Sequence, residues 1–382
     1  MLISPTSPTS PIKETSVRPS SHLRRPAGAL ALGALAASTG ALVGLPSPAD
    51  AATGPTATLR RGTLTVTGTA ARDVVDVTVG ATEVTVDFGF DGTVDARFAR
   101  SKVRRVNVSS GAGDDGLSVD GDGVGDLPIT LSGGLGNDGG GVVGGTGDFA
   151  VGTQPVTING DDGNDNLIAA AAAPTTVFAG AGDDRIDGGA AIAAPLTVSL
   201  GDGNDRYATA FGASGDHNDV VDGGLGADSM RMDGTFATES VGLTANAGHL
   251  LVRHDFRDQI DADNVEDVTF VGFGGLDESG SGDAVAVDDL STTDVTRFTP
   301  DFSVGNGAPN NSIDTLTVRA TAGNDRIVVS GAGSSTTVAG LQPLVTAAFL
   351  APDDFLRIET LAGDDTVDTS GLPAGHVQLL IF

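Results

Sequence analysis

A frame of eleven residues that begins with proline and ends with aspartate recurs along this chain, and it constrains the fold more than any other feature. Each copy has Thr two residues after the Pro, an aliphatic residue directly after that Thr, and Gly, then Asn or Asp, then Asp at its end. A recurring frame indicates a repeat architecture, in which units stack because none can bury its apolar face alone. Four copies superpose without gaps: Pro128–Asp138, Pro155–Asp165, Pro174–Asp184 and Pro195–Asp205.

Each frame predicts a strand, a tight turn and a second strand. The Pro-x-Thr-aliphatic part is β-branched and too short for a helix, and its repeated Thr predicts a threonine ladder on the solvent face. The Gly-rich part supplies residues for positive φ, and its Asp and Asn favour a turn. The chain is therefore predicted to be all-β, a parallel β-solenoid (β-roll or β-helix) with Gly/Asp-rich turns stacked on one edge. The apolar residues expected to start the second strand are Leu167, Ile186, Tyr207 and Met230.

The frame extends in both directions beyond these four copies. Closing aspartates 19–27 residues apart fit one coil each, and spacings of 40–49 fit two coils of which one has lost its acidic turn. Thr85–Gly89 is interpreted as such a degenerate coil, and Val268–Phe270 is expected to lead into an acidic turn that ends at Asp277. We expect degenerate coils at 52–104, a repeat core with acidic turns at 105–235 and degenerate repeats at 236–382. The closing aspartates are Asp73, Asp115, Asp138, Asp165, Asp184, Asp205, Asp228, Asp277, Asp325 and Asp365.

The amino terminus is predicted to be a targeting segment. An apolar run from Ala27 to Leu45 is followed by Ala49-Asp50-Ala51, a cleavage site of the A-x-A type. These features predict a secretory signal peptide over 1–51 and a secreted, extracellular or cell-surface protein. A membrane anchor is the rival reading, because the run is about long enough to span a bilayer. No later segment is long and apolar enough to cross a membrane.

The composition limits the partners of this chain. The net charge is −29, and Lys102 is the only lysine after the targeting segment, which argues against nucleic acid and anionic membranes as partners. There is no Cys, so disulfide and thiolate–metal chemistry are excluded. A charge this negative favours disorder. The apolar residues nevertheless recur at regular intervals, so we expect the chain to fold once its charge is neutralised.

The acidic turns carry the most specific motif. The segments 133–138 and 223–228 match the pattern G-G-x-G-x-D, and 110–115, 160–165, 179–184 and 200–205 are looser versions. On these motifs the chain resembles the RTX (repeats-in-toxin, haemolysin-type calcium-binding) family over 105–235, and its flanks more loosely. The segments 322–327 and 361–373 also resemble calcium-binding repeat proteins that actinobacteria secrete.

The resemblance implies a set of calcium ligands. In that family the last Asp of each turn binds calcium through its side chain, early glycines offer backbone carbonyls, and each ion lies between turns one coil apart. The family's spacing of nine places acidic turns on both edges. Here Ala169–Ala173 and Gly188–Ala194 leave the second edge mostly non-acidic, which implies a single calcium ladder. The implied metal-site residues are Asp115, Asp138, Asp165, Asp184, Asp205, Asp228, Asp114, Asn137, Asn164, Asp183, Asn204, Asp161, Gly111, Gly113, Gly134, Gly136, Gly163, Gly180, Gly182, Gly201, Gly203, Gly224 and Gly226.

The residue types themselves favour calcium among the metals. Carboxylates and carbonyls are hard oxygen donors, and a flexible loop suits the large Ca²⁺ ion better than Mg²⁺. Carboxylates one strand apart, about 4.8 Å, repel one another, and an ion between them turns repulsion into bridging. A metal-free alternative stays open, in which Asp and Asn cap the turns through hydrogen bonds. The loop 120–127 is either another calcium loop or an acidic surface linker, and we favour the linker.

Three functions fit these observations. The first is a secreted, non-enzymatic calcium-binding repeat protein with a structural role or an interaction with extracellular polysaccharide or protein. The alternative is a calcium-dependent lyase or epimerase on a β-helix, whose basic residues would come from Lys102, Arg104, Arg105 and the region 231–254. A carrier half of a toxin or protease is disfavoured, because the repeats follow the signal directly. Where the frame calls for another acidic turn the sequence stops at Phe382, so we expect truncation or capping by a partner.

Overall fold

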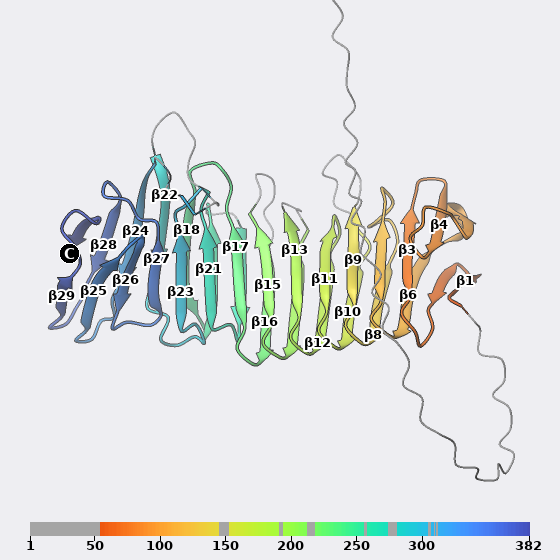
Figure 1. Ribbon diagram of the computed structural model, residues 1–382, viewed down its shortest axis with the longest axis horizontal. Coiled ribbons are helices and arrows are strands. Elements are labelled where there is room, and N and C mark those ends of the chain that lie inside the picture. Colours follow the sequence, from red (N-terminus) through yellow and green to blue (C-terminus); the bar gives the residue numbers. More distant parts are fainter. Residues whose placement is uncertain are drawn as a thin grey trace, which may run out of the picture. The chain divides into compact units, whose positions relative to one another are not determined.

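The computed structural model describes residues 54–144, 153–190, 194–211, 218–255, 258–273, 281–304, 307–308, 310 and 312–382, all within the unit Asp50–Phe382. The predicted signal peptide and Asp277 lie outside these residues. Within the described part the structure is almost entirely strands, arranged in two sheets of 15 (Figure 1). Its only helix among the described residues is the short 3-10 turn η1 (Arg100–Lys102), so none there could cross a membrane.

Sheet A is parallel over most of its length, with antiparallel pairs β1–β2 and β20–β19–β18. Its strands, in spatial order, are β1 (Thr56–Arg60), β2 (Thr63–Thr67), β6 (Arg105–Ala112), β8 (Ile129–Leu135), β10 (Val156–Asp162), β12 (Thr175–Ala181), β14 (Leu196–Asp202), β16 (Asn218–Leu225), β20 (Asp258–Asp263), β19 (His249–His254), β18 (Ser240–Asn246), β22 (Ser281–Val287), β24 (Ile313–Arg319), β28 (Phe355–Glu359) and β30 (Gln378–Ile381).

Sheet B has the same character, with antiparallel strands β25–β26–β27 near one end and β3–β4–β5 at the other. Its strands, in spatial order, are β29 (Thr366–Gly371), β25 (Arg326–Ala332), β26 (Ser335–Ala339), β27 (Leu344–Ala348), β23 (Arg297–Asp301), β21 (Asp267–Val271), β17 (Ser229–Asp233), β15 (Arg206–Ala210), β13 (Arg185–Ala190), β11 (Asn166–Ala171), β9 (Gly139–Gly144), β7 (Gly116–Asp120), β3 (Val74–Val79), β4 (Glu83–Phe88) and β5 (Ala96–Ala99).

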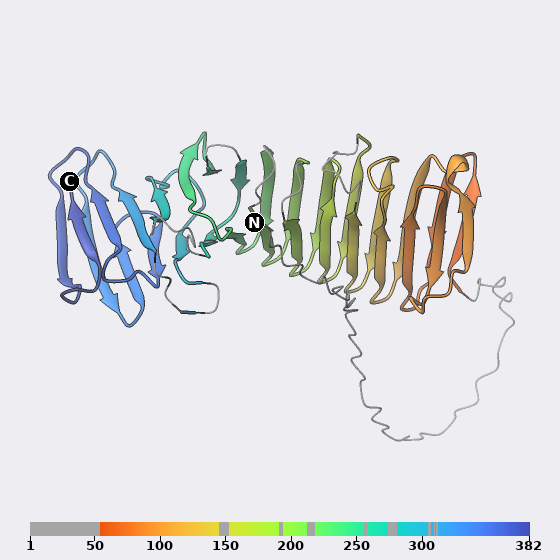
Figure 2. The same ribbon diagram turned by 90° about the horizontal axis from the view of Figure 1, so that it is seen from above.

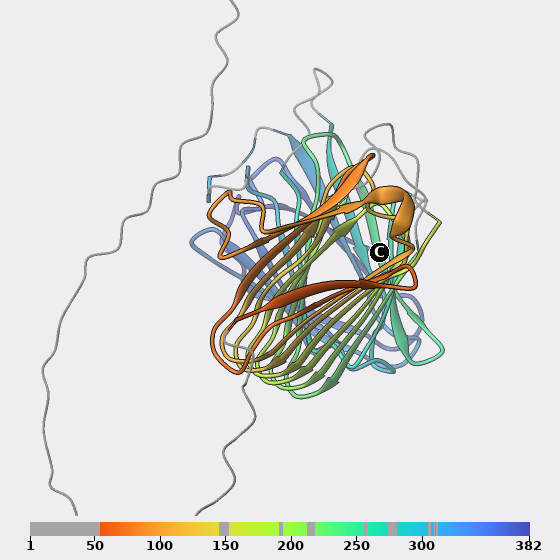
Figure 3. The same cartoon turned by 90° about the vertical axis from the view of Figure 1, so that its right-hand side faces the viewer.

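The chain alternates between the sheets, one strand in A and the next in B, from β6 to β17. This arrangement confirms the predicted all-β parallel solenoid. The turns that lead from sheet A to sheet B form one edge, which we call the acidic edge, and the turns that return from B to A form the opposite edge. Figure 3 views these coils along the direction in which they stack, and Figure 2 shows the strands from above.

Alternation of side chains within each strand creates the core between the sheets. In β14, Leu196 and Val198 are buried, whereas Thr197 between them is exposed. Thr197 lies beside Thr176 of β12 in the register of sheet A, so the predicted threonine ladder forms on the outward face. The expected second-strand residues also lie in the core, each at most 3% exposed: Leu167, Ile186, Tyr207 and Met230.

The long spacings between closing aspartates have a different origin from the one predicted. Asp73 donates its backbone N–H directly to Asp115, and Asp325 donates to Asp365, so each pair belongs to adjacent turns. The residues between Asp73 and Asp115 add β4 and β5 at the end of sheet B, and those between Asp325 and Asp365 insert β26 and β27 within it, between β25 and β23. Thr85–Gly89 is therefore not a degenerate coil, because most of it forms β4, which runs antiparallel to β3. Alternating apolar residues mark a strand in either direction, so the pattern could not reveal the reversal.

The sheet predicted for Val268–Phe270 is also wrong. We expected Val268–Phe270 to lead into an acidic turn ending at Asp277. The structure places these residues in β21 of sheet B, after the acidic edge, where Glu266 occupies the closing position. The predicted surface linker is corrected in part as well. Asp122 and Asp126 are exposed, but Val124 and Leu127 are buried, so this loop packs into the core at the opposite edge.

Candidate metal centre

The closing aspartates form a continuous column along the acidic edge. Each donates its backbone N–H to the carboxylate Oδ1 of the closing Asp in the next coil, at 2.7–2.8 Å. These bonds fix one carboxylate per coil and align the predicted side chains in one row. We call this row the buried column: Asp115, Asp138, Asp165, Asp184, Asp205 and Asp228.

A second, exposed ladder runs beside the buried column, through the residue before each closing Asp. Here the hydrogen bonds run the other way: Asn164 donates its N–H to Asn137 Oδ1 of the preceding coil, at 2.8 Å. Successive peptide N–H groups of the turn therefore point in opposite directions along the stack, and each meets an Asx side chain. Asp and Asn serve equally in this ladder, which consists of Asp114, Asn137, Asn164, Asp183 and Asn204.

Two turn positions need residues without a Cβ. All eleven predicted glycines have positive φ, and their carbonyls point at the next coil: a Cβ at Gly136 would meet the Gly113 carbonyl, and one at Gly182 the Gly163 carbonyl. The coils therefore approach closely through these glycines. Asp161 is the exception, with φ 76° at a position that is Gly in the neighbouring coils.

Replacement of this residue, Asp161→Gly, is expected to stabilise the fold. A left-handed conformation costs an L-residue roughly 1–2 kcal/mol. The substitution removes that cost but loses the exposed bond from Ser132 Oγ to Asp161, at 2.5 Å. We expect a net gain of about 0.5–1 kcal/mol in the free energy of unfolding, measured by urea denaturation. Asp162→Gly serves as the control and should give no gain.

The buried column leaves half of its oxygens without a partner. Oδ2 of all six aspartates is buried and receives no hydrogen bond, although these residues are only 1–4% exposed. A buried carboxylate oxygen that no donor meets is costly. The same oxygen is left without a donor at one position of six successive coils.

Backbone carbonyl oxygens lie close to some of these Oδ2 atoms. A Cβ on Gly133 would meet both Asp138 Oδ2 and the carbonyl of Gly160, and one on Gly160 would meet both Asp165 Oδ2 and the carbonyl of Ala179. In these two turns a carboxylate oxygen and a carbonyl oxygen of the next coil thus lie around one glycine. Carboxylates and carbonyls are the donors that Ca²⁺ takes. No three carboxylate or imidazole side chains of the described residues form a cluster that could hold a metal, so carbonyls would have to complete any such site.

The pKa values of the column reflect this environment. Burial raises the pKa of Asp184 to about 7, and neighbouring carboxylates add to the rise. The pKa values of Asp165 and Asp228 rise to about 6 for the same reasons, and those of Asp138 and Asp205 are also raised. Without a cation, the carboxylates of Asp165, Asp184 and Asp228 would bind protons at about pH 6 to 7.

The metal-free protein should therefore lose stability as the pH rises. The ordinary Asp pKa is 3.8, so between about pH 4 and pH 7 the folded state binds more protons than the unfolded state. Urea denaturation of calcium-stripped protein should show the free energy of unfolding falling across this window. Asp184→Asn should flatten the fall above pH 6, whereas Asp202→Asn, an exposed residue of the next turn, should not. A stability that rises with pH in the absence of calcium would contradict this assignment.

The flanking turns close the column in different ways. Asp73 Oδ2 accepts hydrogen bonds from the N–H and the hydroxyl of Thr69, at 2.5 and 2.9 Å. Asp325 Oδ2 accepts the same two groups of Thr321. At the other end Asp228 donates to Glu266 Oε2, at 2.7 Å. The carboxylates of Asp73 and Asp325 therefore cap their own turns through hydrogen bonds, which fits the metal-free alternative at these two positions.

Acidic residues also gather on the opposite edge, where sequence analysis predicted few. Asp283 donates its N–H to Asp314 Oδ1 and Asp314 donates to Asp354 Oδ1, at 2.7 and 2.9 Å, and all three are buried. Glu239 joins this row and also contacts His254, which stacks on Phe211. The signal that could have found them is an acidic residue two and four places before inward aliphatic residues, as in Asp-Ala-Val-Ala-Val at 283–287.

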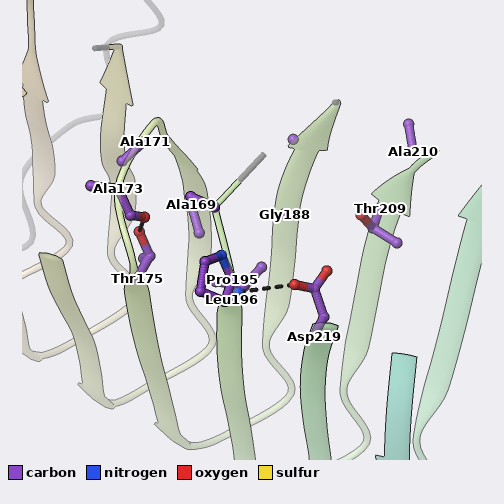
Figure 4. A pocket seen from close by; sticks show the side chains of 12 residues that line it. Ala169, Ala171, Ala173, Thr175, Gly188, Pro195, Leu196, Thr209, Ala210 and Asp219 are labelled. Atoms are coloured by element: carbon purple, nitrogen blue, oxygen red, sulfur yellow. Dashed lines mark hydrogen bonds between the residues drawn. The ribbon is translucent and has the colours of Figure 1, made fainter. Parts of the chain in front are cut away.

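The described residues on the opposite edge of the central coils are mostly apolar, as predicted, although 191–193 of the predicted segment lie outside them. Small side chains such as Ala171 and Ala173 leave a cavity of about 20 Å³, enough for a single water molecule (Figure 4). Asp219 is the one acidic residue on its wall, and its Oδ1 accepts the N–H of Leu196 at 2.9 Å. This cavity is too small for a substrate.

The basic residues proposed for a lyase or epimerase are not brought together. Lys102 and Arg105 lie exposed at η1 and β6, Arg104 packs over Gly62, and Arg231 pairs with Asp233 on sheet B. His254 is buried among sheet A strands, which fits the packing role predicted for it. These residues therefore form no common site.

The fold and this column define an all-β parallel solenoid with a row of buried carboxylates. No family model, curated protein or solved structure matches the chain.

Proposed function

We propose that this chain is a secreted calcium-binding solenoid whose Gly/Asp turns take up Ca²⁺ between coils, so that the ion makes the stack rigid. The observation that carries the proposal is the row of six buried Oδ2 atoms without hydrogen-bond partners. The metal-free alternative accounts for Oδ1, which caps the neighbouring N–H group. It accounts for Oδ2 only where the carboxyl group is protonated.

The buried column would supply the carboxylate ligands, and the turn carbonyls would complete the shell. Gly160 and Ala179 are the first candidates, because their carbonyls lie around the same glycines as Asp138 Oδ2 and Asp165 Oδ2. The exposed ladder is a poorer source of ligands, because its Oδ1 atoms accept N–H groups and Asn replaces Asp in three of its five turns. The predicted role of Asp114, Asn137, Asn164, Asp183 and Asn204 is thereby reduced to alignment of the turns.

The biological role that follows is structural. Extracellular calcium modules have dissociation constants of about 10⁻⁴–10⁻³ M, so such sites fill after export and stay empty at cytosolic calcium levels. The chain would be loose before export and rigid outside, where it could act as a spacer or an interaction surface.

Isothermal titration of calcium into the calcium-stripped chain 52–382 tests this function. Six consecutive aspartates enclose five intervals, so we expect about five ions, and weaker or no binding of Mg²⁺. Asp165→Asn should reduce the number bound, and Asp202→Asn, which removes the same charge from an exposed position, should leave it unchanged. Absence of binding at about ten times the upper dissociation constant would overturn the proposal.

A further inference from the structure

A hollow of about 530 Å³ lies on the outward face of sheet B, across β13, β15, β17 and β21. It is distinct from the buried column, whose side chains point inward at the acidic edge. Its walls include Arg185, Arg206 and Arg231, and Ala208 between them is small. In a chain with a net charge of −29, three arginines around one hollow need an explanation.

The register of the sheet places two of these arginines side by side. Arg185 and Arg206 are direct partners of β13 and β15, and both are exposed. Like charges directly opposite one another on adjacent strands destabilise a sheet. Within the described part of the structure neither forms an ion pair with an acidic side chain, in contrast to Arg231, which pairs with Asp233 at 2.7 Å.

Two arginine side chains without ion pairs, on adjacent strands whose backbones lie about 4.8 Å apart, suit one carboxylate. Guanidinium groups bind carboxylates through paired, charge-assisted hydrogen bonds. The far wall has a different chemistry, with the Thr269 hydroxyl and the carboxylates of Asp233 and Asp267. These carboxylates pair with Arg231 and Arg297, at 2.7 and 2.8 Å, and keep further lone pairs that can accept hydrogen bonds from hydroxyl groups. The hollow therefore offers cationic groups at one end and hydroxyl-binding groups at the other.

We propose that this hollow binds an acidic sugar, with the uronate carboxylate between Arg185 and Arg206 and the ring hydroxyls toward Thr269, Asp233 and Asp267. A neutral sugar would leave the two arginines unpaired. A long polyanion would meet the negative charge of the surrounding protein, so one or a few acidic sugar residues fit best. The site does not require the calcium proposal.

Calorimetric titration of the chain 52–382 with galacturonate, with a short oligogalacturonate and with neutral galactose tests this site. We expect galacturonate to bind, galactose to bind at least 10-fold more weakly, and Arg185→Gln or Arg206→Gln to weaken galacturonate binding roughly 10-fold or more. Arg326→Gln is a matched control, because Arg326 also follows a closing Asp but its partner in the sheet is Thr366. It should leave the affinity unchanged.

Each outcome decides the proposal. Binding of monomer and oligomer with similar affinity identifies a single-residue site, and tighter binding of the oligomer identifies a short acidic glycan as the source. Equal affinities for galactose and galacturonate, an unchanged affinity in both arginine variants, or no binding of either acidic ligand would overturn it. The variants are used only if their circular dichroism matches that of the parent chain. Titrations with and without calcium then show whether sugar binding depends on the proposed calcium sites.

Discussion

Removal of calcium at neutral pH is expected to lower the free energy of unfolding of this chain by roughly 7 kcal/mol. At free calcium about ten times the dissociation constant, each ion bound only by the folded state contributes about 1.4 kcal/mol, and the buried column encloses five intervals. The loss is comparable to the total stability of many domains. It arises because the carboxylates left behind are buried, lack donors on Oδ2 and repel one another.

Urea denaturation followed by circular dichroism measures this effect, with and without chelator at pH 7.5. We expect the midpoint to fall sharply in chelator and to recover when calcium is restored in excess. Magnesium at the same concentration should restore much less, because it demands a tighter octahedral shell. Equal midpoints in calcium and in chelator would show that the column is stable without a metal.

The second large effect is a substitution whose effect on the free energy of unfolding changes sign when calcium is removed. In calcium, Asp184→Asn should destabilise the fold by roughly 3 kcal/mol, because Asp184 borders two intervals of the column and both lose a charged ligand. In chelator the same substitution should stabilise it. The amide keeps an Oδ1 that can accept the Asp165 N–H. It also removes the buried negative charge of a carboxyl group whose pKa is raised to about 7.

Asp183→Asn is the matched control for this experiment. Asp183 belongs to the exposed ladder, and Asn occupies the equivalent position at 137, 164 and 204. This substitution removes the same charge one residue away, so it should change stability little in either condition. If Asp184→Asn were stabilising both with and without calcium, the column would be a metal-free row of hydrogen-bonded carboxylic acids.

The solenoid and the buried column could be predicted from the sequence because both follow from a periodic pattern. Residues such as Val198 and Asp205 recur at fixed offsets, and stacking in register is the arrangement that buries the first and aligns the second. The spacing between copies could not separate an additional coil from antiparallel strands inserted into one coil. That distinction depends on chain direction, which the alternation of Val84 and Val86 in β4 does not reveal.

The remaining features depend on contacts between distant residues. Glu266 replaces Asp at the end of the column because its longer side chain still reaches the Asp228 N–H, and no local motif marks it. Asp283 and Asp314 lie 31 residues apart and become neighbours through the pairing of β22 and β24. Arg185 and Arg206 become adjacent in the same way, so the hollow on sheet B could not be found from composition or motifs.

A crystal structure of the chain in saturating calcium, with anomalous scattering to locate the ions, tests the central claim most directly. The account predicts anomalous peaks between successive coils, within about 2.3–2.6 Å of Oδ2 of aspartates such as Asp165, Asp184 and Asp205. A well-ordered column without such peaks, whose Oδ2 atoms meet only protein or water, would contradict it.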